Sequence, residues 1–170
     1  MLAGWSDFFA LTGSAGATLV GLLFVVVTLG TNLSTSRTME IADASMTPAL
    51  YCFGSVLLQS MAALAPWPSD VPVGILFVVG GTVGAVYRIA GIRVRRKVKL
   101  RAINSLLNWN FYNVVPVVAA ICLIAGGAGL IRGDSLAPFA VAGSSALFLV
   151  GGIYQSWTET LALIALKGDS

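Results

Sequence analysis

Side chains suited to acid–base, nucleophilic or metal chemistry are scarce in this chain of 170 residues. Histidine, the commonest metal ligand and general base, is absent. The two cysteines, Cys52 and Cys122, lie within apolar runs without CxxC spacing, which is typical of buried thiols rather than of zinc sites or disulfides. No G-x-S-x-G turn occurs, and Lys97, Lys99 and Lys167 all lie outside the apolar runs, so the sequence offers no serine–lysine pair inside a membrane. We therefore expect no enzyme, no catalytic residues, no metal and no cofactor.

Polar residues that could line a path gather on two predicted helical faces. In the first apolar run they follow spacings of 7, 4, 3, 7 and 4 residues, which is one side of a helix. The residues are Asp7, Ser14, Thr18, Gly21, Thr28 and Asn32 on this face, and Ser145, Gly152, Gln155 and Glu159 on a similar face near the C-terminus. Two interpretations stay open. The faces line a hydrated path or ion site with Asp7 and Glu159 near its outer and inner ends, or their small hydroxyls only pack against neighbouring helices.

The amino-acid composition indicates whether these helical faces lie in water or in a membrane. Hydrophobic residues make up 57% of the chain and charged residues 10%, and the mean hydropathy is +0.90, whereas soluble domains carry about 25% charged residues. A water-soluble globule of 17.6 kDa could not bury so much apolar side chain. The sequence predicts an integral membrane protein and argues against an aqueous enzyme, a nucleic-acid-binding module or a disordered linker.

The apolar runs predict an all-α bundle of five transmembrane helices that forms a single domain over residues 1–170. Each predicted crossing has the roughly 20 residues that a helix needs to span a bilayer. The crossings lie near 8–30, 47–66, 72–92, 111–131 and 137–158. The third includes Arg88, whose side chain we expect to reach the headgroups from the last turn of the helix.

Lysine and arginine placement predicts the orientation. With the N-terminus outside, nine of the ten Lys and Arg lie on the inner side and Arg132 alone lies on the outer side, as the positive-inside rule requires. Seven of them fall between Arg88 and Arg101, so the basic cytoplasmic segment is 93–108. We expect this segment to continue as a surface helix that faces anionic lipid headgroups rather than nucleic acid. Its basic residues are Arg93, Arg95, Arg96, Lys97, Lys99 and Arg101.

Glycine and alanine at four-residue spacing predict close helix–helix packing. Helices in a bilayer associate through close approach and hydrogen bonds, because lipid tails are as apolar as leucine. The chain has 19 glycines, many of them inside the predicted crossings. The predicted packing residues are Gly13, Ala17, Gly21, Gly80, Gly84, Gly129 and Gly133.

The N-terminal region resembles a known group of proteins. The run Trp5-Ser6-Asp7-Phe8-Phe9, followed by small residues and by Gly21-Leu22-Leu23-Phe24-Val25, is similar to the opening helix of a group of small bacterial polytopic inner-membrane proteins. The similarity covers roughly the first 30 residues. Some members are automatically named as modulators of a membrane-anchored protease, so the resemblance implies a bacterial inner membrane and an accessory role. It carries no motif-defined functional residues.

Two functions follow as hypotheses. The first is a homo-oligomeric channel-like or transport protein whose path lies between subunits and is lined by the first or the fifth helix. The alternative is a non-catalytic accessory or scaffold protein that binds another membrane protein through its glycine-rich faces. The expected partners are therefore anionic lipids, further copies of the chain and, in the second case, a different membrane protein.

Overall fold

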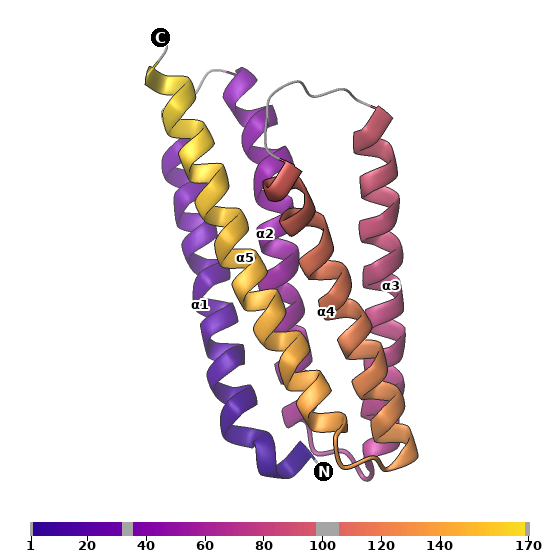
Figure 1. Ribbon diagram of the computed structural model, residues 1–170. Helices are drawn as coiled ribbons and strands as arrows, with labels where there is room; N and C mark the ends of the chain where they lie inside the picture. The colour runs from indigo at the N-terminus through magenta and orange to yellow at the C-terminus, as the bar shows by residue number, and fades with distance from the viewer. Residues whose placement is uncertain (1, 32–35, 98–105, 169–170) are drawn as a thin grey trace.

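A computed structural model describes residues 2–31, 36–97 and 106–168 (Figure 1). Throughout these ranges the regular structure is helical, as the sequence predicts. A short 3-10 helix η1 (Leu2–Trp5) leads into α1 (Ser6–Thr31). The other helices are α2 (Ser36–Leu64), α3 (Asp70–Lys97), α4 (Leu106–Arg132) and α5 (Ala137–Gly168). At 1.5 Å per residue, even the 26 residues of α1 extend about 39 Å, so the helices exceed the roughly 30 Å hydrocarbon core.

Four of the helices are long and apolar enough to cross a membrane. The candidate spans are Leu2–Val25, Asp70–Ala90, Val114–Arg132 and Ala137–Trp157. The apolar part of α2 is shorter, Pro48–Leu64, although α2 runs beside α1 and α5 (Figure 1). By length and composition, these helices are consistent with a multi-pass membrane protein.

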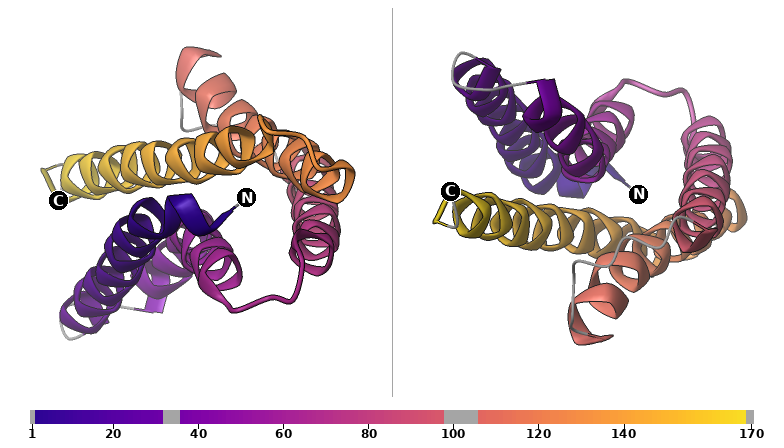
Figure 2. Two further views of the ribbon diagram at one scale, coloured as in Figure 1. Left: turned by 90° about the horizontal axis from the view of Figure 1, so that it is seen from below. Right: turned by 90° about the horizontal axis from the view of Figure 1, so that it is seen from above.

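The helices do not pack in the order of the chain. α1 packs on α2, α2 on α5, α5 on α4 and α4 on α3, whereas α2 and α3 barely touch although only a short connection joins them. The two end-on views show α3 beside α4 and set apart from α2 (Figure 2). The N- and C-termini lie at opposite ends of the bundle (Figure 1). The bundle is therefore open on one side, between α2 and α3.

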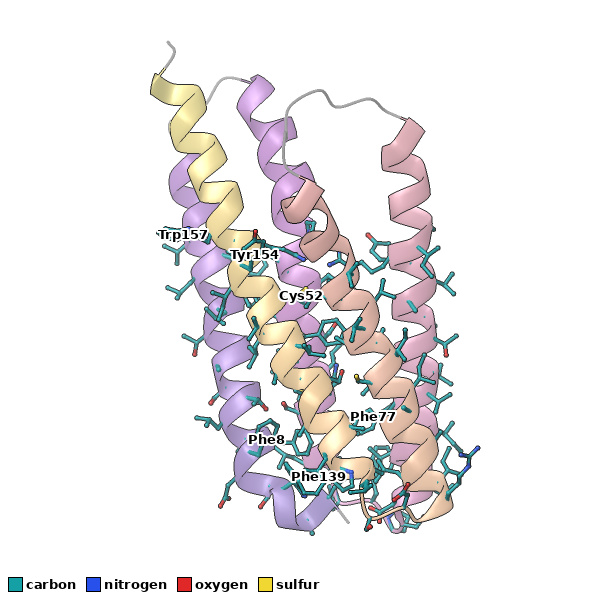
Figure 3. The ribbon with its side chains drawn as sticks, in the orientation of Figure 1. Phe8, Cys52, Phe77, Phe139, Tyr154 and Trp157 are labelled. Carbon is teal, nitrogen blue, oxygen red and sulfur yellow. The ribbon has the colours of Figure 1, made fainter. Side chains whose placement is uncertain are left out.

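Aromatic side chains fix the end of the bundle that carries the N-terminus. The centre of the Trp5 ring lies 4.7 Å from the centre of the Phe139 ring and 5.8 Å from that of the Phe8 ring, and both contacts are edge to face. These contacts join η1 and the start of α1 to the start of α5, and Phe8 and Phe139 lie near one another there (Figure 3). In the α2–α3 connection the indole nitrogen of Trp67 donates to the Ala62 carbonyl at 2.7 Å. Interfacial tryptophans are typical of membrane protein boundaries.

Several of the close helix contacts are made by glycines other than the predicted ones. A Cβ added to Gly127 would meet the Gly74 carbonyl at 2.6 Å, and a Cβ on Gly74 would meet the Gly127 carbonyl at 2.7 Å. Gly81 faces the Ala120 carbonyl in the same α3–α4 contact, with a Cβ distance of 3.1 Å, and Gly126 faces Val141 between α4 and α5. Backbones can approach so closely only where no side chain intervenes.

Three of the seven predicted packing residues lie against another helix, and the other four do not. Gly13 lies against Ser60, Gly84 against the Tyr51 hydroxyl and Gly129 against Ala137. Ala17 is exposed, and a Cβ at the exposed Gly21 or Gly80 would meet nothing within 4 Å. Gly133 has a φ of 77° and serves the α4–α5 turn instead of a helix contact, because this left-handed conformation favours glycine.

The start of the predicted basic segment belongs to a longer helix than expected. α3 continues without a break to Lys97, so Arg93, Arg95 and Arg96 extend the third helix instead of starting a separate surface helix. Lys99 and Arg101 lie outside the described residues, and α4 begins at Leu106, before the end of that segment. The cause is local, since the sequence from Arg88 to Lys97 contains no proline and its only glycine is Gly91.

Candidate functional site

The polar face of α1 points away from the bundle. Asp7, Ser14, Thr18 and Thr28 are exposed, and Gly21 shares this exposure. The three hydroxyls donate to carbonyls of their own helix: Ser14 to Leu11 at 2.9 Å, Thr18 to Ser14 at 2.8 Å and Thr28 to Val25 at 2.9 Å. Asn32, the last member of the predicted face, lies outside the described residues.

The polar face of α5 has the opposite placement, inside the bundle. Ser145 is 0% exposed and Gln155 is 1% exposed. Gly152 is buried against the Phe53 ring of α2, and Glu159 lies on α5 beyond the apolar span that ends at Trp157. The structure therefore does not bring the two predicted faces together, and α5 contributes its buried polar groups to α2 rather than to a path shared with α1.

One layer of polar groups lies inside the bundle, in the half that adjoins the N-terminus. The Ser145 hydroxyl donates to Oε1 of Gln59 on α2 at 3.0 Å, and the Thr12 and Ser60 hydroxyls are 3.2 Å apart. Gln59 is 5% exposed, and its Nε2 has no hydrogen-bond partner within the described part of the chain. A buried donor without a partner is costly, particularly in hydrocarbon. Gln59 therefore has an unsatisfied donor inside the bundle, and the buried hydroxyl of Ser144 on α5 is in the same condition within the described structure.

A second polar layer surrounds Arg88, eight residues further along α3 from Gly80. The guanidinium carbon lies 5.0 Å from the centre of the Tyr51 ring, and Nη2 lies 3.8 Å from Cys52 Sγ. With the Gln155 amide oriented to satisfy both of its ends, its oxygen accepts from Arg88 Nη2 at 3.3 Å and its nitrogen donates to the Pro48 carbonyl at 3.2 Å. Cys52, which belongs to this second layer, lies nearer than Phe77 to the end that carries the C-terminus (Figure 3).

The placement of Arg88 corrects the expectation that its side chain reaches the headgroups. α3 continues for nine residues after Arg88, so this residue does not lie in the last turn. Its guanidinium turns inward because an aromatic face and an amide oxygen are available on α2 and α5. Arginine inside a transmembrane bundle normally marks a functional or structural polar centre.

A groove of about 270 Å³ opens on the side of the bundle between α2 and α3. Its walls and floor are largely apolar, with Tyr51, Gln59, Phe77, Gly80, Leu123 and Phe148 among the lining residues. The groove exists because α3 packs on α4 and stays away from α2, and because Gly80 and Gly81 place no side chain in it. Concave, mainly apolar sites with a few polar groups are the usual form of small-ligand sites.

Sequence reasoning singled out Ser145 and Gln155 of these polar layers but missed Gln59 and the inward placement of Arg88. Gln59 is a lone amide in an otherwise apolar run, and Arg88 is a lone cation at the end of one. Such isolated polar residues in predicted crossings were the available signal. Among the residues that the structure describes, no three His, Cys, Asp or Glu side chains gather in a way that could hold a metal ion.

Comparison with protein-family models, curated proteins and solved structures gave no match.

Proposed function

We propose that this protein is a non-catalytic, multi-pass protein of the bacterial inner membrane that acts as a homo-oligomer. In the proposed topology all five helices cross the bilayer, with the N-terminus outside and the C-terminus inside. The opposite positions of the two termini support an odd number of crossings (Figure 1). The basic residues near the ends of α3 and α5 support placing that end at the anionic cytoplasmic surface.

The observation that carries the oligomer is the outward face of α1. Ser14, Ala17, Thr18 and Gly21 are small and exposed, and Ala17 and Thr18 each lie three or four residues from both Ser14 and Gly21, so the four form one strip on the helix. Open space surrounds Gly21. A second helix could approach this strip closely, and close approach is what drives helix association in lipid. We take the second helix to be α1 of another copy, because a two-fold axis brings such a face against itself.

The hydrogen bonds of this face favour packing over solvation. The Ser14 and Thr18 hydroxyls already donate to carbonyls of α1, so they need neither water nor a partner to satisfy their protons. The strip therefore suits a dry helix–helix contact. This is the packing interpretation of the α1 face, and it supports a protein that works by assembly.

The test is the subunit number in lipid nanodiscs, with Gly21→Leu compared with Gly143→Leu. Both glycines are exposed and helical, and a Cβ at either meets nothing within 4 Å, so neither change disturbs the fold of one subunit. Gly21→Leu should convert oligomers to monomers, because the leucine holds the neighbouring helix away. Gly143→Leu should leave the oligomer unchanged. A monomeric unmodified protein, or an oligomer that survives Gly21→Leu, would contradict the proposal.

A conduction path between copies is the second candidate, and the exposed polar face of α1 favours it. Asp7, Ser14, Thr18 and Thr28 all face outward, where copies could enclose them. Ser145 and Gln155 are buried within one subunit and do not join such a path. Ion flux into vesicles that carry the oligomer separates this channel-like or transport function from assembly alone, and co-purification of a different membrane protein would instead favour the accessory function.

A further inference from the structure

The two halves of α3 are positioned by different neighbours. In its N-terminal half, α3 meets the α4 backbone closely at Gly74 and again at Gly81. Toward their other ends α3 and α4 diverge, so the last turns of α3 stand apart from the first turns of α4 (Figure 1 and Figure 2). There Gly84 faces the Tyr51 hydroxyl of α2. Contacts with α2 therefore help to position the C-terminal half of α3.

Arg88 makes the main polar contacts between this half of α3 and the rest of the bundle. Its guanidinium carbon lies 5.0 Å from the centre of the Tyr51 ring of α2, and Nη2 donates to the Gln155 amide oxygen of α5 at 3.3 Å. α2 and α3 otherwise barely touch, and the groove separates them between these contacts and their connection at residues 65–69. A change in the position of Arg88 therefore acts directly on the gap between α2 and α3.

The Arg88 side chain is also within reach of the membrane surface. Arg88 lies two residues before the end of the apolar span Asp70–Ala90, which is about 3 Å along the helix axis. A long arginine side chain covers this distance, and arginines near the ends of apolar spans commonly extend to the headgroups. The planar guanidinium forms paired hydrogen bonds with a phosphate group. A headgroup phosphate therefore competes with Tyr51 and Gln155 for the same cation.

The inward and outward positions of Arg88 are close in free energy. The contact of a cation with an aromatic ring is of the same order as the attraction of one charge to an anionic membrane surface. The amide acceptor on the inward side is matched by phosphate oxygens on the outward side. α3 continues through Arg93, Arg95 and Arg96, so an anionic surface also attracts the end of the helix. The charge of the membrane can thus decide between the two positions.

We propose that Arg88 is a latch that anionic phospholipid opens. In a neutral membrane the guanidinium stays against Tyr51 and Gln155 and holds the C-terminal half of α3 near α2. In an anionic membrane it binds a headgroup phosphate, and the C-terminal half of α3 moves away from α2. The contacts at Gly74 and Gly81 keep the other half on α4, so the movement is local. The inference is independent of the oligomer, because Arg88 and the exposed strip of α1 lie on different helices.

The test measures distances between α2 and α3 by pulsed electron paramagnetic resonance, using the full chain in lipid nanodiscs. Spin labels are carried by an unnatural amino acid with a ketone group, which leaves the native cysteines unmodified, and dilution with unlabelled protein suppresses distances between copies. One labelled pair is Leu50 and Val86, at the level of Arg88. The other is Met61 and Ile75, near the α2–α3 connection. All four side chains are exposed.

The two labelled pairs should respond differently to lipid charge. Replacing phosphatidylcholine nanodiscs with nanodiscs rich in phosphatidylglycerol should shift the Leu50–Val86 pair to longer distances and leave the Met61–Ile75 pair unchanged. An unchanged Leu50–Val86 distance, or an equal shift of both pairs, would overturn the proposal. Inorganic phosphate added to phosphatidylcholine nanodiscs should cause no shift, and a shift there would contradict a lipid as the ligand.

Variants of the two contacting residues test the latch itself. Arg88→Leu should abolish the response to lipid charge, because leucine offers no cation to the Tyr51 ring or to a phosphate. Tyr51→Leu removes the aromatic face and should give the longer Leu50–Val86 distance already in phosphatidylcholine. Tyr51→Phe keeps that face and serves as the matched control, so it should respond as the unmodified protein does. A response retained in Arg88→Leu, or Tyr51→Leu behaving like Tyr51→Phe, would refute the assignment.

Discussion

At the residue scale, the polar groups inside the bundle form pairs between α2 and its neighbours. Gln59 accepts from Ser145 of α5, and Tyr51 lies beneath the guanidinium of Arg88 of α3. Each pair replaces the water that a soluble protein would supply, since hydrocarbon offers no hydrogen bonds. The Gln59–Ser145 bond therefore helps to select α5 as the neighbour of α2, and the Arg88–Tyr51 contact connects α3 to α2 where the two helices otherwise barely touch.

Gln155→Leu should destabilise the protein through Arg88. The change removes an amide that accepts from Arg88 Nη2 at 3.3 Å and donates to the Pro48 carbonyl at 3.2 Å. Loss of an acceptor from a partly buried cation costs about 1–3 kcal/mol, so thermal unfolding in detergent should shift to clearly lower temperature. Val150→Leu at an exposed site on the same helix serves as the control and should leave the unfolding temperature unchanged. Equal unfolding temperatures in Gln155→Leu and the unmodified protein would show that Arg88 does not depend on this amide.

At the element scale, the contact between α3 and α4 depends on facing glycines. Gly74 and Gly127 place each backbone against the carbonyl of the other, and Gly81 repeats the approach near Ala120. This close contact holds α3 to α4 and leaves the space beside α2 that becomes the groove. The position of α3 thus follows from where its glycines lie around the helix.

Gly127→Ala should weaken this contact, because the new methyl group would lie 2.6 Å from the Gly74 carbonyl oxygen. Overpacking of this kind costs about 1–3 kcal/mol. Gly143→Ala makes the same chemical change at a site with nothing within 4 Å. Thermal unfolding in detergent should therefore separate the two variants by several degrees, and coincident unfolding curves would contradict the packing of α3 on α4.

The sequence predicted helix positions well but helix faces poorly. Apolar runs between charges located all five helices, four of which are long and apolar enough to span a bilayer. The choice between Gly80 and Gly81 could not be made in the same way, since almost every side of α3 is apolar and the sequence does not mark the side that meets α4. Likewise, the Gln59–Ser145 pair requires knowing that α2 and α5 are neighbours, which apolar periodicity does not encode.

At the scale of the whole molecule, charge is distributed unevenly along the bundle axis. The ends of α3 and α5 carry Arg93, Arg95, Arg96, Lys97 and Lys167, whereas Asp7, Asp70 and Asp134 lie at the ends that adjoin the N-terminus. A difference of this kind orients helical membrane proteins, because lysine and arginine remain on the cytoplasmic side. Each such charge gains about 1 kcal/mol near an anionic membrane surface.

The proposed topology predicts opposite accessibility of the two termini. In intact cells an impermeant reagent should label a tag on the N-terminus and leave a tag on the C-terminus unlabelled until the membrane is broken. Replacing Arg93, Arg95 and Arg96 with glutamine removes about 3 kcal/mol of the orienting preference and should produce a fraction of molecules with reversed labelling. Arg132→Gln should produce no reversed labelling. It removes the one basic residue on the outer side, where the positive-inside rule disfavours lysine and arginine. Labelling of both tags from one side would mean an even number of crossings, with α2, whose apolar stretch is the shortest, as the helix that fails to span.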